Sequence, residues 1–114
     1  MRCLLVDDDP TFLETARSVL TRDGATVAGT ASCSAEAARQ ATALHPDVAV
    51  VDIRLGTENG FDVARDLATQ GITVIMTSTS AEADYADLIA ESPAVGFLGK
   101  AELSAAGIRR ILGS

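Results

Sequence analysis

Short apolar runs alternate with helix-like segments along the whole chain, and this alternation restricts the possible folds more than any other sequence feature. Five strands are predicted, at residues 2–6, 26–29, 48–51, 72–77 and 94–98. Five helices are predicted, between residues 9 and 23 and at 34–44, 61–69, 80–90 and 102–112, with caps at Asp9 and Ser34. The alternation predicts an α/β fold with a doubly wound, five-stranded parallel sheet covered by these helices.

The composition indicates one globular domain that spans residues 1–114. No apolar stretch approaches the roughly 18 residues that a membrane span requires. The formal net charge of −7 disfavours binding to nucleic acid or to anionic membranes, because both require clustered Lys and Arg. No signal peptide precedes the first predicted strand, so we expect a cytoplasmic protein in which Cys3 and Cys33 are free thiols.

Acidic residues follow two of the predicted strands. Asp7 and Asp8 come directly after the first strand, and Asp52 comes directly after the third. The carboxyl ends of parallel strands meet at one edge of the sheet, where open α/β sheets bind their ligands. Carboxylates gathered at one edge repel each other, and a hard cation with oxygen ligands relieves that repulsion. The residues therefore predict a Mg²⁺-dependent phosphate site.

Ser78 and Lys100 follow the fourth and fifth predicted strands, so they are expected at the same edge. Carboxylates, a hydroxyl and an ammonium together are the groups that phosphoryl transfer requires. Taken singly, these residues could be a solvated turn, a strand-end acid and a surface lysine. Their common location favours the functional interpretation. Within the hydroxyl-rich run after the fourth strand, Thr79 is the alternative to Ser78.

Together these motifs resemble the receiver domain of bacterial two-component response regulators, and the resemblance covers essentially all 114 residues. It rests on Val6-Asp7-Asp8-Asp9-Pro10, Val50-Val51-Asp52-Ile53-Arg54-Leu55, Gly60, Val74-Ile75-Met76-Thr77-Ser78 and Phe97-Leu98-Gly99-Lys100. The resemblance implies a flavodoxin-like sheet with the strand order 2-1-3-4-5. It also implies a signalling switch and not a turnover enzyme.

The resemblance implies a role for each acidic residue. Asp52 corresponds to the phosphoacceptor, which would attack phosphorus as a carboxylate nucleophile. Asp8 would bind Mg²⁺ directly, and Asp7 would bind it largely through water. Asp52 itself and the backbone carbonyl of Arg54 would complete the protein ligands of the metal.

The resemblance also implies how the site would be read out. Ser78 would hydrogen-bond a phosphoryl oxygen. Lys100 would pair with Asp52 in the empty site and with the phosphoryl group in the filled one. Phe97 corresponds to the switch aromatic, whose rotamer follows Ser78. The output would be two conformations of a face built from the fourth helix, the fifth strand and the fifth helix.

The expected partners are a sensor histidine kinase, or a small phosphodonor, and a downstream protein or an output domain that contacts this face. A homodimer and a stand-alone receiver are the other arrangements that stay open. Two alternative functions stay open. One is a pseudo-receiver, a phosphate-independent interaction module, and the other is a small Mg²⁺-dependent phosphatase, which would normally have an acid where Arg54 stands.

The chain departs from the family pattern near the site. Ala101 replaces the proline that usually follows the lysine, so a trans peptide bond is expected there. Thr79 is bulkier than the usual residue beside the acceptor, and Gly56 replaces a frequent proline. The side chain of Arg54 is expected to lie over the acidic pocket and to neutralise part of its charge.

Overall fold

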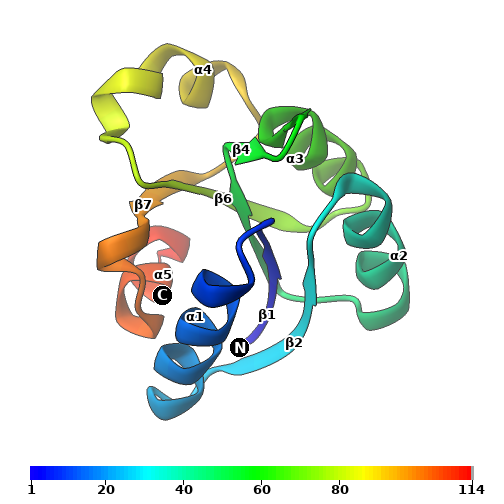
Figure 1. The fold of residues 1–114 in the computed structure, drawn as a ribbon, viewed down its shortest axis with the longest axis vertical. Coiled ribbons are helices and arrows are strands. Elements are labelled where there is room, and N and C mark those ends of the chain that lie inside the picture. The colour runs from blue at the N-terminus through cyan, green and yellow to red at the C-terminus, as the bar shows by residue number, and fades with distance from the viewer. Residues whose placement is uncertain (114) are drawn as a thin grey trace.

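The computed structural model describes residues 1–113 and confirms the predicted α/β architecture (Figure 1). The parallel sheet has five strands in the order β2-β1-β3-β6-β7. These are β1 (Arg2–Val6), β2 (Thr26–Ala31), β3 (Val48–Asp52), β6 (Thr73–Ser78) and β7 (Gly96–Gly99). The order matches the predicted 2-1-3-4-5, because β4 (Arg54–Leu55) and β5 (Glu58–Asn59) form a separate antiparallel hairpin that was not predicted.

Helices cover both faces of the sheet. α1 (Pro10–Arg22) and α5 (Ala105–Leu112) pack on one face, whereas α2 (Ser34–Leu44), α3 (Gly60–Thr69) and α4 (Ala86–Glu91) pack on the other. Figure 1 shows α1 and α5 on one side of the strands and α2 and α3 on the other. All residues of β3 are buried, as predicted for a strand that is covered on both faces.

Alternation along β1 decides which way the following acids point. Leu4 and Val6 belong to the core cluster under α2 and α3, and Cys3 and Leu5 belong to the cluster under α1 and α5. Side chains of a strand point to opposite faces in turn. The side chain of Asp7 is therefore expected on the α1/α5 side of the sheet, the same side as those of Cys3 and Leu5.

The prediction of one helix at residues 80–90 is wrong in its extent. The structure has a 3-10 helix η1 (Glu82–Tyr85) followed by α4, which is only six residues long. Neither element contains a buried residue. A long helix on a sheet needs a continuous apolar stripe, and this acidic segment contributes only Tyr85 and Ile89 to the core as partly buried residues.

Other helix starts also differ from the predictions. The last helix begins at Ala105 and not at residue 102, because η2 (Lys100–Glu102) forms a 3-10 turn before it. Ser104 caps α5 by accepting a hydrogen bond from the Gly107 N–H at 2.9 Å. The predicted cap at Ser34 is wrong, since Cys33 occupies the N-cap position of α2 without a side-chain hydrogen bond. Local pattern alone does not separate a cap from the first helical residue.

The smaller predictions agree with the structure. Asp9 caps α1 by accepting a hydrogen bond from the Thr11 N–H at 3.0 Å. Both cysteines are free thiols. Over residues 1–113 there is no cis peptide bond, and no helix is long and apolar enough to cross a membrane.

Gly60 lets α3 begin directly against the end of β3. A Cβ atom at this position would lie 1.9 Å from the backbone oxygen of Asp52 and 2.9 Å from the Cα of Ile53. The Gly60 N–H donates to the Ile53 carbonyl at 2.8 Å, and Asn59 caps the helix by accepting from the Phe61 N–H at 2.8 Å. This close approach fixes the path of the chain between Asp52 and the start of α3.

Candidate functional site

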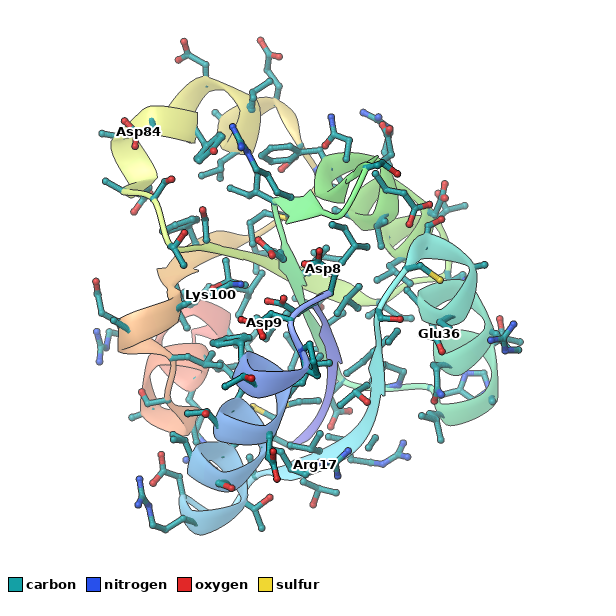
Figure 2. The ribbon with its side chains drawn as sticks, viewed as in Figure 1. Asp8, Asp9, Arg17, Glu36, Asp84 and Lys100 are labelled. Atoms are coloured by element: carbon teal, nitrogen blue, oxygen red, sulfur yellow. The ribbon has the colours of Figure 1, made fainter. Side chains whose placement is uncertain are left out.

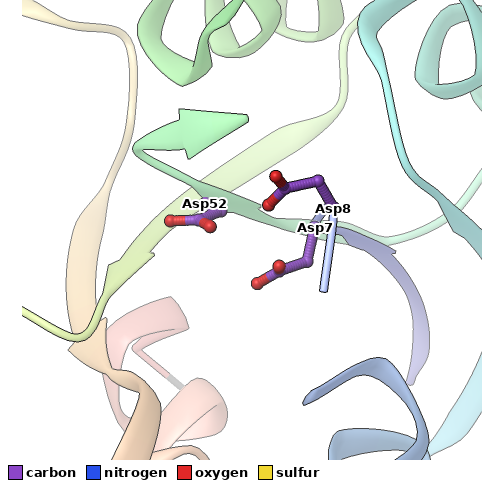
Figure 3. Close-up of side chains that lie close together, drawn as sticks. All are labelled: Asp7, Asp8 and Asp52. Carbon is purple, nitrogen blue, oxygen red and sulfur yellow. The ribbon is translucent and has the colours of Figure 1, made fainter. Parts of the chain in front are cut away.

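Asp7, Asp8 and Asp52 form one cluster at the carboxyl edge of the sheet. Each carboxylate offers an oxygen that lies within 4.8 Å of the others. Figure 3 shows Asp7 and Asp8 leaving the end of β1 and Asp52 leaving β3, with the carboxylates turned toward one space. Asp7 is 1% exposed and Asp52 is 6% exposed, whereas Asp8 lies at the surface. The cluster therefore combines two buried acids with one accessible acid.

Strand register brings these acids together. β1 and β3 are neighbours, and Val6 pairs with Val51 across them. The next residues along the two strands are Asp7 and Asp52, so they emerge side by side on the same face. Asp52 in turn pairs with Thr77 of β6, one residue before Ser78. The sequence prediction that these residues meet at one edge is consistent with this geometry.

Lys100 places its ammonium among the carboxylates. Its Nζ lies 2.7 Å from Oδ2 of Asp7 and donates to Oδ2 of Asp52 at 3.2 Å. Figure 2 shows the Lys100 side chain directed from the start of η2 toward the loop that carries Asp8 and Asp9. The expected Asp52 contact is present, but the shorter contact is with Asp7, which sequence reasoning missed.

Competing effects of burial and neighbouring charges set the pKa values of Asp52 and Lys100. Burial raises the pKa of Asp52, and the charge of Asp7 raises it further. Lys100 and the Arg54 N–H act to lower this pKa, but they do not offset the first two effects, so it lies above its ordinary value. Burial acts to lower the pKa of Lys100, but the contacts with Asp7 and Asp52 outweigh it and hold that pKa above its ordinary value. The contacts of Lys100 therefore favour its ammonium form, whereas burial and the charge of Asp7 disfavour the ionised form of Asp52.

The donor set fits a hard divalent cation. Over residues 1–113, Oδ2 of Asp7 is buried without a hydrogen bond, and its contact with Lys100 is ionic. Oδ1 of Asp7 already accepts from the Asp9 N–H at 2.9 Å. A Mg²⁺ ion, which takes carboxylate oxygens and keeps several waters, would satisfy the remaining lone pairs and the net negative charge.

Ser78 lies where the sequence placed it, at the end of β6. Its side chain is buried, and its Oγ accepts a hydrogen bond from the Ser80 N–H at 3.0 Å. The hydroxyl hydrogen can still donate elsewhere. A cleft of about 510 Å³ adjoins it, and Phe97, Lys100 and Thr79 are among the residues that line this cleft.

The prediction for the Arg54 side chain does not agree with the structure. Arg54 is exposed, and among residues 1–113 it forms no ion pair with the clustered acids. It lines a separate cleft of about 280 Å³ together with Tyr85 and Leu88. Its backbone N–H does contact the site, since it donates to Oδ1 of Asp52 at 3.3 Å.

Glu58 ties the hairpin after Asp52 to α2, a contact that sequence reasoning missed. Its carboxylate accepts from the Ser34 N–H at 2.8 Å and from the Ser34 hydroxyl. Both contacts lower the pKa of Glu58, the hydroxyl more than the N–H. The hairpin turn includes Gly56, which adopts a φ of +63° near Asp8. The hairpin is therefore held to α2 at its far end.

Comparison with known proteins gives a consistent result. The chain matches the family model of the response regulator receiver domain over residues 3–111. It is 36% identical over 91 residues to the DNA-binding response regulator MtrA of Mycolicibacterium smegmatis, covering 77% of this chain and 38% of MtrA. It is 25% identical over 104 residues to the DNA-binding transcriptional activator EvgA of Escherichia coli K12, covering 90% of this chain and 51% of EvgA. The chain thus spans about half or less of these relatives.

Solved structures share the fold. A response regulator receiver domain protein from Clostridium thermocellum superimposes with a TM-score of 0.80 at 28% identity, covering 98% of this chain and 90% of that one. The signal receiver domain of a modulated diguanylate cyclase from Desulfovibrio desulfuricans G20 gives a TM-score of 0.82 at 29% identity, with the same coverage of 98% and 90%.

Proposed function

The chain belongs to the family of response regulator receiver domains, and from this premise we propose that Asp52 accepts a phosphoryl group in a Mg²⁺-dependent reaction. The observation that carries the proposal is the cluster of Asp7, Asp8 and Asp52 with the Lys100 ammonium among them. Receiver domains are signalling domains, so the proposed role is that of a regulator. Residues 1–114 would form a single receiver domain in the cytoplasm.

The proposed metal ligands are Asp7, Asp8, Asp52 and the backbone carbonyl of Arg54. Mg²⁺ bound there would neutralise charge on the carboxylates and on the incoming phosphoryl oxygens. Asp8 is the exposed member of the cluster, so it is the acid that entering metal would meet first. Oδ2 of Asp7, which has an ionic contact with Lys100 but no hydrogen bond among residues 1–113, supports the assignment of that residue.

Asp52 would act as the nucleophile. One carboxylate oxygen forms a bond to phosphorus, and the bond from phosphorus to the leaving group breaks, with its electron pair going to the leaving group. The buried position of Asp52 and the hydrogen bond from the Arg54 N–H hold the carboxylate in one orientation. Such positioning is a main source of rate in phosphoryl transfer.

Ser78 and Lys100 would hold the transferred group. The Ser78 hydroxyl has a free hydrogen, and the Lys100 ammonium lies 3.2 Å from the Asp52 oxygen. Both are placed to donate to phosphoryl oxygens beyond that carboxylate. When they do so, Lys100 exchanges its contact with Asp52 for one with the phosphoryl group.

Phe97 is the proposed switch residue. It is partly buried and lines the same cleft as Ser78, so movement of Ser78 toward a phosphoryl group would open room on that side of the ring. The affected surface is built from α4, β7 and α5. A sensor histidine kinase is the proposed donor. An output domain, a downstream protein or a second copy of the chain is the proposed partner of the surface, by analogy with the longer regulators that the chain matches.

Intact mass spectrometry tests this proposal. We expect the wild type to gain one phosphoryl group when it is incubated with Mg²⁺ and acetyl phosphate or a phosphorylated histidine kinase. The gain should disappear when EDTA removes the metal and in the Asp52→Asn variant. If neither donor modifies the wild type, the domain is a phosphate-independent interaction module. A gain that persists in Asp52→Asn would place the acceptor elsewhere.

A further inference from the structure

Phe12 lies against the ammonium of Lys100, and it has no role in the proposed phosphoryl transfer. The Lys100 Nζ is 4.6 Å from the centroid of the Phe12 ring. We propose that Phe12 is a positioning residue that holds the Lys100 ammonium against Asp7 and Asp52 and so opposes its displacement. The contact stands on geometry alone, and its consequence for Mg²⁺ binding rests on the metal site of the proposed function.

The ammonium is held from two sides. Carboxylate oxygens of Asp7 and Asp52 lie 2.7 and 3.2 Å from Nζ, and the ring of Phe12 faces the same atom. The face of an aromatic ring carries partial negative charge, so it attracts a cation without adding a third carboxylate to the cluster. The ring therefore stabilises the ammonium beside the two carboxylates.

Phe12 is linked to the acidic cluster through Asp9. The Asp9 N–H donates to Asp7 at 2.9 Å, and the Asp9 side chain caps α1 by accepting from the Thr11 N–H at 3.0 Å. Phe12 is the third residue of α1, so its position relative to Asp7 is fixed through this short connection. The partly buried ring also packs on the α1/α5 core cluster, which limits its movement.

Lys100 itself depends on such a contact. It begins the 3-10 turn η2, and Ala101 follows it where a proline would restrict the backbone. A lysine side chain is long and flexible, and it occupies one position only when its ammonium has fixed partners. Phe12 supplies a partner that is neither a metal ligand nor a phosphoryl acceptor.

The arrangement has a direct consequence for metal binding. Mg²⁺ and the Lys100 ammonium compete for the oxygens of Asp7 and Asp52, so whatever stabilises the ammonium there weakens metal binding. Removal of the aromatic face should therefore tighten Mg²⁺ binding. The expected change in Kd is about 2- to 10-fold, the range that corresponds to one cation–π contact.

The first test is an NMR measurement that needs no variant. Lys100 is the only lysine in the sequence, so protein labelled with ¹³C-lysine gives one side-chain spin system. In the metal-free wild type, the Hε resonances should lie clearly upfield of those of free lysine, because the adjoining Nζ lies over the ring. Resonances at the free-lysine position would overturn the proposal.

The second test compares three variants by calorimetric titration with Mg²⁺. Phe12→Leu keeps the apolar volume and removes the aromatic face, and Phe12→Tyr keeps both. Leu13→Met is the packing control, because Leu13 packs on the same core cluster from the neighbouring position. Phe12→Leu should lose the upfield shift and bind Mg²⁺ about 2- to 10-fold more tightly, whereas the other two variants should stay within about twofold of wild type.

The outcomes separate the inference from the proposed function. Weaker or unchanged Mg²⁺ binding in Phe12→Leu, or an equal change in Leu13→Met, would overturn the positioning role. Neither measurement requires phosphoryl transfer. A domain that shows the shift and the tighter metal binding, yet never becomes phosphorylated, would refute the proposed function and leave the role of Phe12 intact.

Discussion

The Asp52→Asn variant is expected to be more stable than the wild type, although it lacks the proposed phosphoryl acceptor. Burial and the charge of Asp7 together outweigh Lys100, so the pKa of Asp52 is raised and its ionised form is unfavourable in the folded metal-free domain. Asn has similar shape and no charge. We expect the free energy of unfolding to rise by about 0.5–2 kcal/mol, as when a strained functional site is relieved.

This stabilisation should depend on pH in a defined direction. Between the ordinary pKa of Asp52 near 3.8 and its raised value in the fold, the folded state binds more protons than the unfolded chain. Wild-type stability therefore falls as pH rises through this window. The advantage of Asp52→Asn should grow over the same window and level off above it. Urea unfolding followed by circular dichroism, with EDTA present, measures the difference at each pH.

Asp8→Asn is the matched control, because Asp8 belongs to the same cluster but is exposed. Its effect on metal-free stability should be smaller than that of Asp52→Asn. If Asp52→Asn is less stable than the wild type at neutral pH, attraction to Lys100 exceeds the combined effect of burial and Asp7. Added Mg²⁺ should stabilise the wild type more than either variant, because ligand binding favours the folded state.

The Gly60→Ala variant is expected to lose most of its stability. Its new Cβ would lie 1.9 Å from the Asp52 oxygen and 2.8 Å from the Asp52 carbonyl carbon, and both are backbone atoms that cannot rotate away. The start of α3 would have to separate from β3. We expect a loss of about 3 kcal/mol or more, at or above the upper end of the range for overpacked cores.

Gly71→Ala separates this steric clash from the general effect of removing a glycine. Gly71 has a φ of +84°, and a Cβ there would meet nothing within 4 Å. The variant should cost only about 1 kcal/mol, because it is strained in the backbone without a collision. Urea midpoints of the two variants give the comparison. Similar losses in both would mean that α3 shifts at little cost. A large loss in Gly60→Ala alone would confirm the close contact.

The sheet and its acidic edge were predictable because their signals are local. An apolar run followed by Asp7 and Asp8, or by Asp52, marks the end of a strand, and right-handed crossovers bring such ends to one edge. The strand order and the placement of Lys100 beside Asp52 agree with that reasoning. The chemical roles of these residues stay predictions until phosphorylation is measured.

The features that sequence reasoning missed depend on contacts between distant segments. Glu58 contacts Ser34 across 24 positions, and the ring of Phe12 near the start of α1 contacts Lys100 at the start of η2. Arg54 was expected over the acids because of its charge, yet its side chain lines a different cleft. A side chain's direction at the end of a strand is set by its neighbours in space, and a single sequence does not contain that information.

The shallow packing of η1 and α4 means that their surface residues contribute little to the stability of the fold. Neither element contains a buried residue, and Leu88 of α4 is 51% exposed. Substitutions at exposed positions generally change stability by less than about 0.5 kcal/mol. Substitutions on the surface of α4 should therefore cost the fold little, whereas substitutions in the buried strands should cost much more. New binding specificities can arise on this helix without prior stabilising mutations elsewhere.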